Sequence, residues 1–415
     1  MATLADTGNL YTANGPADFW HVISEPKPSD AEWAAAAEAA INALGLPELR
    51  SATDMGRLLA QTLGESQFGV NHWDLGPSKR LYYELKPFLP RAVTRLLRQV
   101  HGFRMQDSFL LRWPIEDRYA RFQWEIMRHL LELTGKETLP FVHFWPHGLR
   151  FALVLTHDIE TLDGQSKVRR VADLEERLGF RSSFNFVLER YRLDRELIRE
   201  LDARGFEIGV HGLRHDGKLF HSEAEFMRRA ERINGHLGEL GAVGFRAPLT
   251  QRNPEWMQAL EIEYDLSFFD TDPYEPIPGG TMCIWPFLCG RFVEMPYTLV
   301  QDYTLTEILR ERNARLWLEK VDFIKGYCGM ALVNTHPDYL RNDRTWQVYV
   351  QYLQEMKRGS EYWHALPREV ARWWRARASG ARPEELAGAV LSEARLSGSA
   401  LVIEPRVVDR AHAAK

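Results

Sequence analysis

The sequence predicts an α/β protein in which a (β/α) barrel follows a mostly helical N-terminal region. Three observations support this prediction. From about residue 148, short apolar segments alternate with amphipathic ones, the pattern of repeated strand–helix units and a parallel sheet. Residues 1–147 instead carry helix caps and helix stops. Polar residues suited to chemistry follow several predicted strands, as they do at the catalytic rim of a barrel.

Composition excludes some classes of protein. The 415 residues suffice for a large domain and a smaller one, and a net charge of -5 does not favour a nucleic-acid partner. No apolar run approaches ~18 residues, so we expect no membrane span. The first residues lack the basic start and apolar core of a signal peptide. The three cysteines, Cys283, Cys289 and Cys328, have neither disulfide nor zinc-site spacing, so we expect a cytoplasmic protein.

Helix signals are found along residues 1–147. Ser29 and Glu32 have the spacing of a capping box and open an alanine-rich helix. Further helices are expected at 90–102 and at 117–135. No set of catalytic residues is evident in this region.

The barrel is expected to occupy residues 148–362. Its many repeated units favour a closed barrel over an open sheet. The predicted strands lie at 151–157, 182–187, 206–210, 242–246, 264–269, 291–295 and 330–334. The predicted helices lie at 167–178, 194–203, 222–240, after Asn253-Pro254, at 304–325 and at 344–358.

Residues 363–415 are expected to form a helix and a tail that pack on the barrel. The helix, at 363–377, has a narrow apolar stripe, which favours packing on the barrel wall over a membrane surface. A short helix at 383–395 and a short strand at 401–404 are expected in the tail.

Two carboxylates follow the first barrel strand. Because residues i and i+2 of a strand share a face, Asp158 and Glu160 are expected to point the same way, with His157 turned away from them. Since the carboxyl ends of barrel strands meet at one rim, these acids should face the polar residues that follow other strands. Those residues are His211, His215, Arg246, Asp270, Asp272 and His336.

A metal site is the first chemistry that this rim suggests. His211 and His215 are four residues apart, which places two imidazoles on one face of a helical turn. The pair alone is a weak signal. With Glu160 it makes a set of two histidines and one acid with open positions, suited to zinc or another divalent ion. Such an ion lowers the pKa of a bound water toward ~7.

Acid–base chemistry is the second. Asp158 is placed to act as a general base, and Arg246 could pair with it or form an ordinary ion pair at the barrel top. His336 could serve as a general acid, although a lone histidine before a proline is usually a loop residue. Either Asp270 or Asp272 could hold its imidazole in the required tautomer, and the sequence does not decide between them.

Four motifs together resemble those of the polysaccharide deacetylase family, also called the NodB-homology family or carbohydrate esterase family 4. They are Thr-His-Asp-Ile-Glu at 156–160, His-Gly-Leu-Arg-His at 211–215, Arg-Ala-Pro at 246–248 and Asn-Thr-His-Pro at 334–337. The resemblance covers roughly residues 148–360. It implies a distorted (β/α) barrel of about seven strands and a metal-dependent N-deacetylase, a class that acts mostly on N-acetylated sugars.

The resemblance also implies roles by position. The positions that match the family's base, its arginine partner, its acid and its two histidine ligands are Asp158, Arg246, His336, His211 and His215. The family usually has an aspartate ligand directly after the base, whereas here Ile159 intervenes and Glu160 follows. Asp270 and Asp272 fall near the family's acid-orienting aspartate, but the tryptophan expected after it is missing.

We therefore expect a hydrolase that removes the acetyl group from an N-acetylated amino sugar in a glycan or glycoconjugate. One divalent metal ion, with Zn²⁺ favoured, is the expected cofactor. Asp272 is expected to join the catalytic set, and Pro248, Asp270 and Trp285 to contact substrate. Two alternatives stay open: a hydrolase of another linear or cyclic C–N amide bond, such as a formamide, and a catalytically silent sugar-binding barrel. The unusual Glu160 is the reason for keeping the silent alternative.

Overall fold

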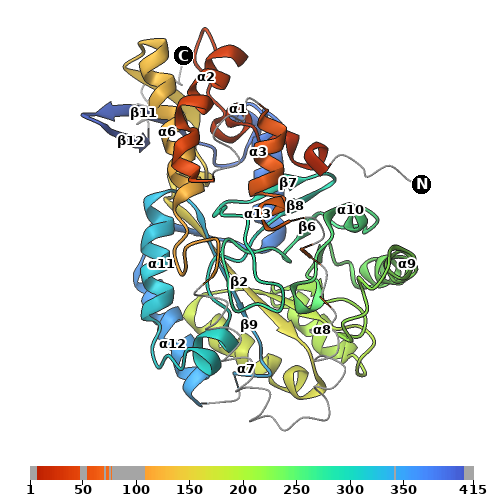
Figure 1. Cartoon of the computed structure of the whole chain (residues 1–415). Coiled ribbons are helices and arrows are strands. Elements are labelled where there is room, and N and C mark those ends of the chain that lie inside the picture. Colours follow the sequence, from red (N-terminus) through yellow and green to blue (C-terminus); the bar gives the residue numbers. More distant parts are fainter. Residues whose placement is uncertain are drawn as a thin grey trace.

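A computed structural model describes residues 7–46, 54–69, 72–73, 76, 108–340 and 343–405. The barrel forms the lower part of Figure 1, and a region built from both ends of the chain lies above it. The helix predicted at 90–102 falls outside the described residues.

A curled parallel sheet forms the barrel, with β2 (Phe151–Ile159) at its centre. One edge of β2 pairs with β9 (Met330–Thr335), and the other edge pairs with β3. The remaining parallel strands follow β3 in spatial order. They are β3 (Ser183–Phe186), β4 (Glu207–Val210), β5 (Gly244–Phe245), β6 (Tyr264–Asp265) and β8 (Phe292–Glu294).

Isolated bridges close the sheet into a barrel. The chain beyond β8 runs on in extended form, so that Tyr297 bridges Phe269 and Leu299 bridges Val333 of β9. In the part of the chain that the structure describes, seven parallel strands thus enclose a distorted barrel, which confirms the predicted fold class. Two short strands extend the sheet, β7 (Phe287–Cys289) antiparallel to β8 and β10 (Tyr362–His364) parallel to β2.

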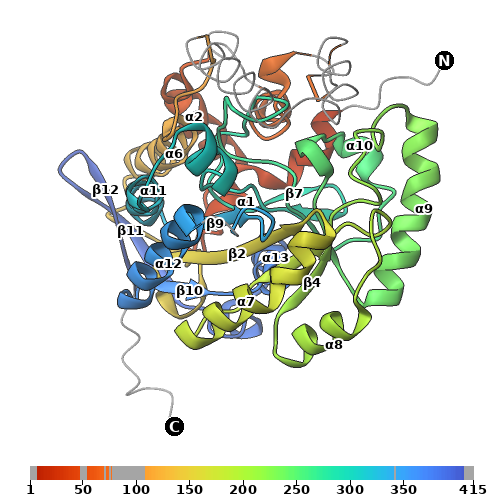
Figure 2. The ribbon, with the colours of Figure 1, turned by 90° about the horizontal axis from the view of Figure 1, so that it is seen from below.

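Helices cover the outside of this sheet (Figure 2). Two of them begin at a side-chain cap and end at a left-handed glycine. The predicted helix 304–325 is interrupted, because a π-helical turn, η8 (Thr304–Ile308), precedes the helix proper. The covering helices are α7 (Leu162–Leu178), α8 (Arg195–Ala203), α9 (Glu223–Leu240), α10 (Pro254–Met257), α11 (Arg315–Gly326) and α12 (Asp343–Arg358).

The upper region combines N-terminal helices with C-terminal strands. Its helices are α1 (Pro16–Trp20), α2 (Asp30–Ala40), α3 (Met55–Thr62) and α6 (Arg118–Thr134), with shorter turns at η1 (Thr7–Asn14), η2 (Ile41–Leu44) and η4 (Ser66–Phe68). Its three-stranded sheet has the order β1 (Thr138–Val142), β11 (Leu391–Ser397), β12 (Ala400–Pro405). The predicted capping box of α2 is present.

The C-terminal predictions need two corrections. The helix predicted at 383–395 is wrong: after the short turn η9 (Pro383–Glu385), the chain forms β11, which pairs with β1 and not with the barrel. The helix predicted from 363 begins four residues later, as α13 (Pro367–Ala378). A proline disfavours the helical conformation in the residue before it, so the helix starts at the proline itself. Trp363 lies in β10 instead, and α13 packs against β6 and β8.

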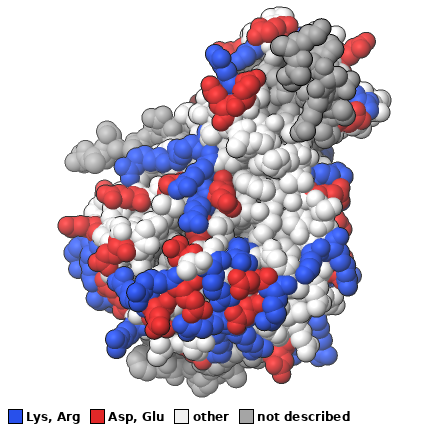
Figure 3. Space-filling model, turned by 180° about the vertical axis from the view of Figure 1, so that it is seen from behind, with Lys and Arg blue, Asp and Glu red and all other residues white. Residues whose placement is uncertain are grey.

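Positive and negative side chains are interspersed over the face shown in Figure 3. Among the described residues, no helix has the length and apolar character needed to cross a bilayer.

Candidate active site and metal centre

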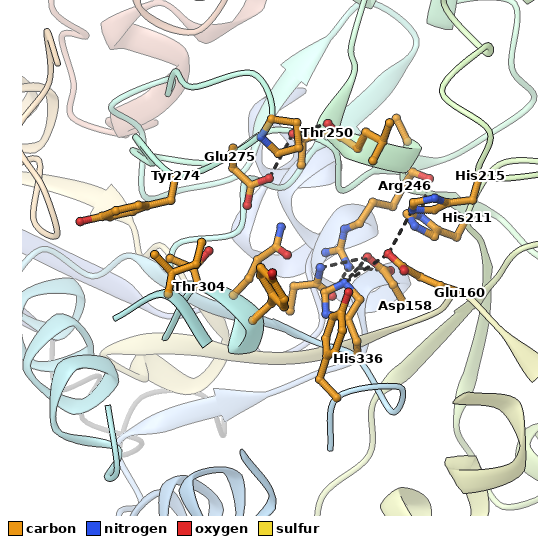
Figure 4. A pocket seen from close by; sticks show the side chains of 18 residues that line it. Asp158, Glu160, His211, His215, Arg246, Thr250, Tyr274, Glu275, Thr304 and His336 are labelled. Carbon is orange, nitrogen blue, oxygen red and sulfur yellow. Dashed lines mark hydrogen bonds and ion pairs between the residues drawn. The ribbon is translucent and has the colours of Figure 1, made fainter. Parts of the chain in front are cut away.

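A pocket lies at the carboxyl ends of the barrel strands. Figure 4 shows the side chains that point into it. It brings together six of the residues predicted from the sequence, which lie at the ends of four barrel strands. They are Asp158, Glu160, His211, His215, Arg246 and His336.

The two carboxylates at the end of β2 lie on the same side, as the alternation of side chains along a strand predicts. Asp158 and Glu160 both line the pocket, while Ile159 between them is fully buried. His157 points to the other side, where its Nε2 lies 2.7 Å from Glu175 and its Nδ1 lies 2.7 Å from the Thr335 hydroxyl. The expectation that His157 is turned away from the acids is confirmed.

Glu160, His211 and His215 form the one group of donors, among the described residues, that could hold a metal ion. One ligand atom from each lies within 4.8 Å of the others, and Glu160 Oε1 is 3.0 Å from His215 Nε2. His211 Nδ1 contacts the carbonyl oxygen of Arg246 at 3.0 Å, which leaves Nε2 for a ligand. Burial lowers the pKa of His211 to about 4, so its imidazole is neutral at pH 7. Two imidazoles with a carboxylate fit a divalent transition metal.

The histidine pair sits on a loop and not on the expected helical turn. Gly212 and His215 both have positive φ, +64° and 52°. At Gly212 a Cβ atom would lie 2.7 Å from the Pro248 ring, so only glycine fits this close approach. Pro248 therefore supports the metal-donor loop from behind, and it is not among the residues that line the pocket.

Asp158 is buried and held by three side chains. Its Oδ1 accepts hydrogen bonds from Arg246 and Asn185, each at 3.0 Å, and its Oδ2 accepts one from Asn334 at 2.9 Å. Burial alone would raise the pKa of this carboxyl. The Arg246 guanidinium and the imidazoles of His211 and His336 outweigh burial and hold the pKa well below its usual range.

His336 faces Asp158 across the pocket, with 3.9 Å between Nε2 and Oδ2. Its Nδ1 lies 2.8 Å from Asp302 Oδ1, and its backbone N–H donates to Asp302 Oδ2 at 2.8 Å. Burial lowers the pKa of the imidazole, but the Asp302 carboxylate more than offsets it, and the pKa rises to about 10. The residue is therefore protonated at neutral pH.

The prediction that Asp270 or Asp272 orients His336 is wrong. Asp270 accepts a hydrogen bond at 2.9 Å from the buried Lys320, which holds it away from the pocket. Asp272 accepts one from the backbone of Tyr274, and neither aspartate lines the pocket. Both belong to the loop behind the pocket wall, because the chain turns away from the rim after β6.

Trp285 is a core residue and does not meet the pocket. It is fully buried, stacks on Trp124 of the upper region, and donates its indole N–H to the carbonyl of Cys328 at 2.9 Å. Composition alone does not distinguish a tryptophan of the core from one on an exposed aromatic face.

Four side chains that support the site were missed. Asn185 and Asn334 lie within strands that were predicted, and both are polar residues on an inward face, which was the available signal. Asp302 follows the extended segment that closes the barrel, and that segment was not recognised as a strand. Asp338 accepts hydrogen bonds from the Glu160 backbone and the Thr161 hydroxyl, and thereby fixes the turn after β2.

Fold and site together describe an α/β barrel protein with a candidate metal centre at its rim. No family model matches the sequence, and no curated protein matches it either. Solved structures do match over about half of the chain. Puue allantoinase is 16% identical over 56% of this chain and 93% of its own, with a TM-score of 0.46.

A candidate polysaccharide deacetylase from Mycobacterium smegmatis is 18% identical, covering 56% of this chain and 92% of its own, with a TM-score of 0.45. Peptidoglycan deacetylase PdaC from Bacillus subtilis is 14% identical, covering 55% and 94%, with a TM-score of 0.36.

Proposed function

We propose that this protein is a metal-dependent N-deacetylase that hydrolyses the acetamide of an N-acetylated amino sugar. One observation carries the proposal: an ionised carboxyl, a protonated imidazole and a three-residue metal-donor set face one another in a single pocket. These are the groups that hydrolysis of an unactivated amide needs. Three of the four motifs that resemble those of the deacetylase family contribute these residues.

Glu160, His211 and His215 would hold the ion, with Zn²⁺ favoured by two imidazoles and one carboxylate. When bound, such an ion acts as a Lewis acid toward a carbonyl oxygen and makes a water molecule more acidic. Ion pairing keeps Asp158 deprotonated, so the carboxylate is ready to take a proton from the attacking water.

The two oxygens of Asp158 differ in their availability. Oδ1 already accepts two hydrogen bonds, from Arg246 and Asn185, whereas Oδ2 accepts one and faces His336. The proton from water therefore goes to Oδ2. His336 gives its Nε2 proton to the departing amine, and Asp302 stabilises the imidazole at Nδ1. Because Nε2 and Oδ2 are 3.9 Å apart, the proton on Asp158 can return to His336 through one water.

The proposal is tested with purified protein, elemental analysis and an assay that separates acetate from formate. We expect a bound divalent metal and acetate release from an N-acetylated oligosaccharide such as N,N′-diacetylchitobiose. Asp158→Asn should lower kcat by roughly 10²–10⁴-fold with unchanged metal content. Asp322→Asn, on the exposed face of α11, is the matched control.

Two results contradict the proposal. Formate release without acetate release would identify a hydrolase of a different C–N bond. A protein that binds the oligosaccharide, holds no metal and takes none up would be a silent sugar-binding barrel.

A further inference from the structure

The peptide group that joins Ile159 to Glu160 is hydrogen-bonded at both of its polar atoms. The Tyr191 hydroxyl donates to the carbonyl oxygen of Ile159 at 2.6 Å. On the other side, the backbone N–H of Glu160 donates to Asp338 Oδ2 at 3.2 Å. A peptide group has one donor and one acceptor, so side chains from two other loops fix this one completely.

The carboxylate of Asp338 also reaches the start of α7. Thr161 is the N-cap of this helix, and its hydroxyl donates to Asp338 Oδ1 while accepting from the Gly164 N–H at 3.2 Å. At Gly164 a Cβ atom would lie 2.6 Å from Asp338 Cγ, whereas non-bonded carbon atoms stay about 3.5–4.0 Å apart. The glycine in the first turn of α7 therefore makes the space that the carboxylate occupies.

The turn that carries Asp338 also carries His336. The N–H groups of Tyr339 and Leu340 both donate to the carbonyl oxygen of His336, at 2.8 and 3.0 Å, which closes a tight turn around Asp338. Glu160 Oε1 lies 4.0 Å from His336 Nε2 (Figure 4). One turn after β9 thus presents the imidazole to the pocket and holds the backbone of the facing metal donor.

Glu160 needs such support because of its place in the chain. Strand β2 ends at Ile159 and α7 begins at Leu162, after its N-cap, so Glu160 belongs to neither element. Its long side chain loses rotational freedom when it binds an ion, and a backbone that is already fixed lowers this cost.

We propose that Asp338 is a positioning residue that holds Glu160 in place as a metal donor. Through this contact, an acid two residues after Asp158 completes the donor set with His211 and His215. The inference rests on the metal centre of the proposed function, and its test needs no substrate.

The test measures the Kd of Zn²⁺ for the purified full chain by competition with a chelating indicator. Asp338→Ala should weaken Zn²⁺ binding about 10–100-fold, the usual effect of losing an outer partner of a metal ligand. Asp338→Asn keeps an oxygen that can accept from the Glu160 N–H, so its Kd should stay within about threefold of the wild-type value.

Two further variants separate positioning from helix capping. Thr161→Val removes the N-cap oxygen of α7 but keeps the bond between Asp338 and Glu160. It should lower Tm while the Kd of Zn²⁺ stays within about threefold of the wild-type value. Gly164→Ala raises the helix propensity of α7 but displaces the Asp338 carboxylate, so it should weaken Zn²⁺ binding by about tenfold or more.

A double-mutant cycle tests whether Asp338 acts through Glu160. In a Glu160→Gln background, Asp338→Ala should change the Kd of Zn²⁺ by less than about threefold, because the donor that it positions is already lost. Equal effects of Asp338→Ala in both backgrounds would overturn the inference.

An unchanged Kd in Asp338→Ala, or an equal loss in Thr161→Val, would also overturn it. Where Asp338→Ala does not fold, Gly164→Ala decides in its place. A chain that shows the expected Zn²⁺ affinities but releases no acetate contradicts the deacetylase proposal alone. A wild-type chain that takes up no Zn²⁺ contradicts both.

Discussion

Asp302 holds His336 at two points, the imidazole Nδ1 and the backbone N–H, each 2.8 Å from a carboxylate oxygen. Both residues are buried, and the contact spans 34 positions of sequence. The two-point contact fixes the orientation of the ring and the tautomer that presents Nε2 to the pocket. It also stabilises the imidazolium, because the carboxylate lies next to the positive charge.

Asp302→Asn should move the alkaline side of the pH–activity profile to lower pH. Asp302 is the strongest of the contacts that raise the pKa of His336 to about 10, and without it burial lowers that pKa. The general acid is then lost as pH rises through a lower value. Above the new pKa of His336, the fraction of enzyme in which His336 is protonated falls about tenfold for each unit by which the pH exceeds that pKa. We therefore expect kcat/KM at pH 9 to fall at least about tenfold more than at pH 6.

Asp272→Asn is the matched control for this measurement. Asp272 is buried on the neighbouring loop but does not contact His336. Its variant should keep the wild-type pH at which activity declines. A shift in this variant with none in Asp302→Asn would contradict the assignment.

The sequence predicted the barrel because strand and helix signals were strong along residues 148–358. It placed six of the pocket residues because polar side chains at strand ends must meet at one rim. Asp302 was missed because it follows an extended segment, near Tyr297 and Leu299, that closes the barrel by single bridges with no strand-length pairing. The apolar run before Asp302 was the one signal that could have shown it.

Long-range packing explains the other errors. Trp285 lies where the upper region meets the barrel, and no local pattern reports that contact. The pairing of β11 with β1 joins segments far apart in the sequence. The alternating pattern of a short segment can indicate a strand, but it does not indicate which other strand it pairs with. Asp270 was expected near His336, but its partner is Lys320 on α11, a helix whose start the sequence misplaced.

Glu160→Gln should weaken metal binding without unfolding the protein. The carboxylate is the one anionic donor of the set, and its side chain is 20% exposed, so an amide fits. Loss of a direct donor should lower metal affinity by more than the roughly 10–100-fold that loss of an outer partner costs. Metal content after dialysis against a zinc buffer measures this, with Glu231→Gln on the exposed face of α9 as the control. Wild-type metal content in Glu160→Gln would place the ion elsewhere.

Glu65→Gln should destabilise the fold and loosen the pocket wall. Glu65 and Arg252 are both fully buried, and two of their N–O contacts are 2.5 Å long. Removing the charge of Glu65 leaves the buried Arg252 guanidinium without its ion-pair partner. Such a loss typically lowers the free energy of unfolding by about 3–5 kcal/mol. The urea midpoint of unfolding should fall, and KM should rise because Glu65 also holds Gly280. Glu263→Gln, which breaks the exposed pair with Arg372, should cost less than about 1 kcal/mol.

Glu207→Gln should remove a pH dependence of stability that the wild type shows between about pH 4.5 and 7. Burial raises the pKa of Glu207 from its usual value of 4.5 to about 7, since the hydrogen bonds from Arg368 N–H and Tyr264 only partly offset it. In the unfolded chain the carboxyl loses its proton near pH 4.5, so the folded state binds more protons in this window. Stability contributed by this group is therefore greatest below pH 4.5 and falls as pH rises to 7.

The size of the Glu207 effect follows from the same two pKa values. A difference of about 2.5 between them corresponds to roughly 3 kcal/mol at pH 8. A glutamine can accept from the Arg368 N–H and donate to the Tyr264 hydroxyl, so both hydrogen bonds survive the substitution. The unfolding free energy of Glu207→Gln should exceed that of the wild type at pH 8 and approach it at pH 5, as urea titrations at the two pH values would show. An equal difference at both pH values would mean that the Glu207 carboxyl does not change its protonation on folding.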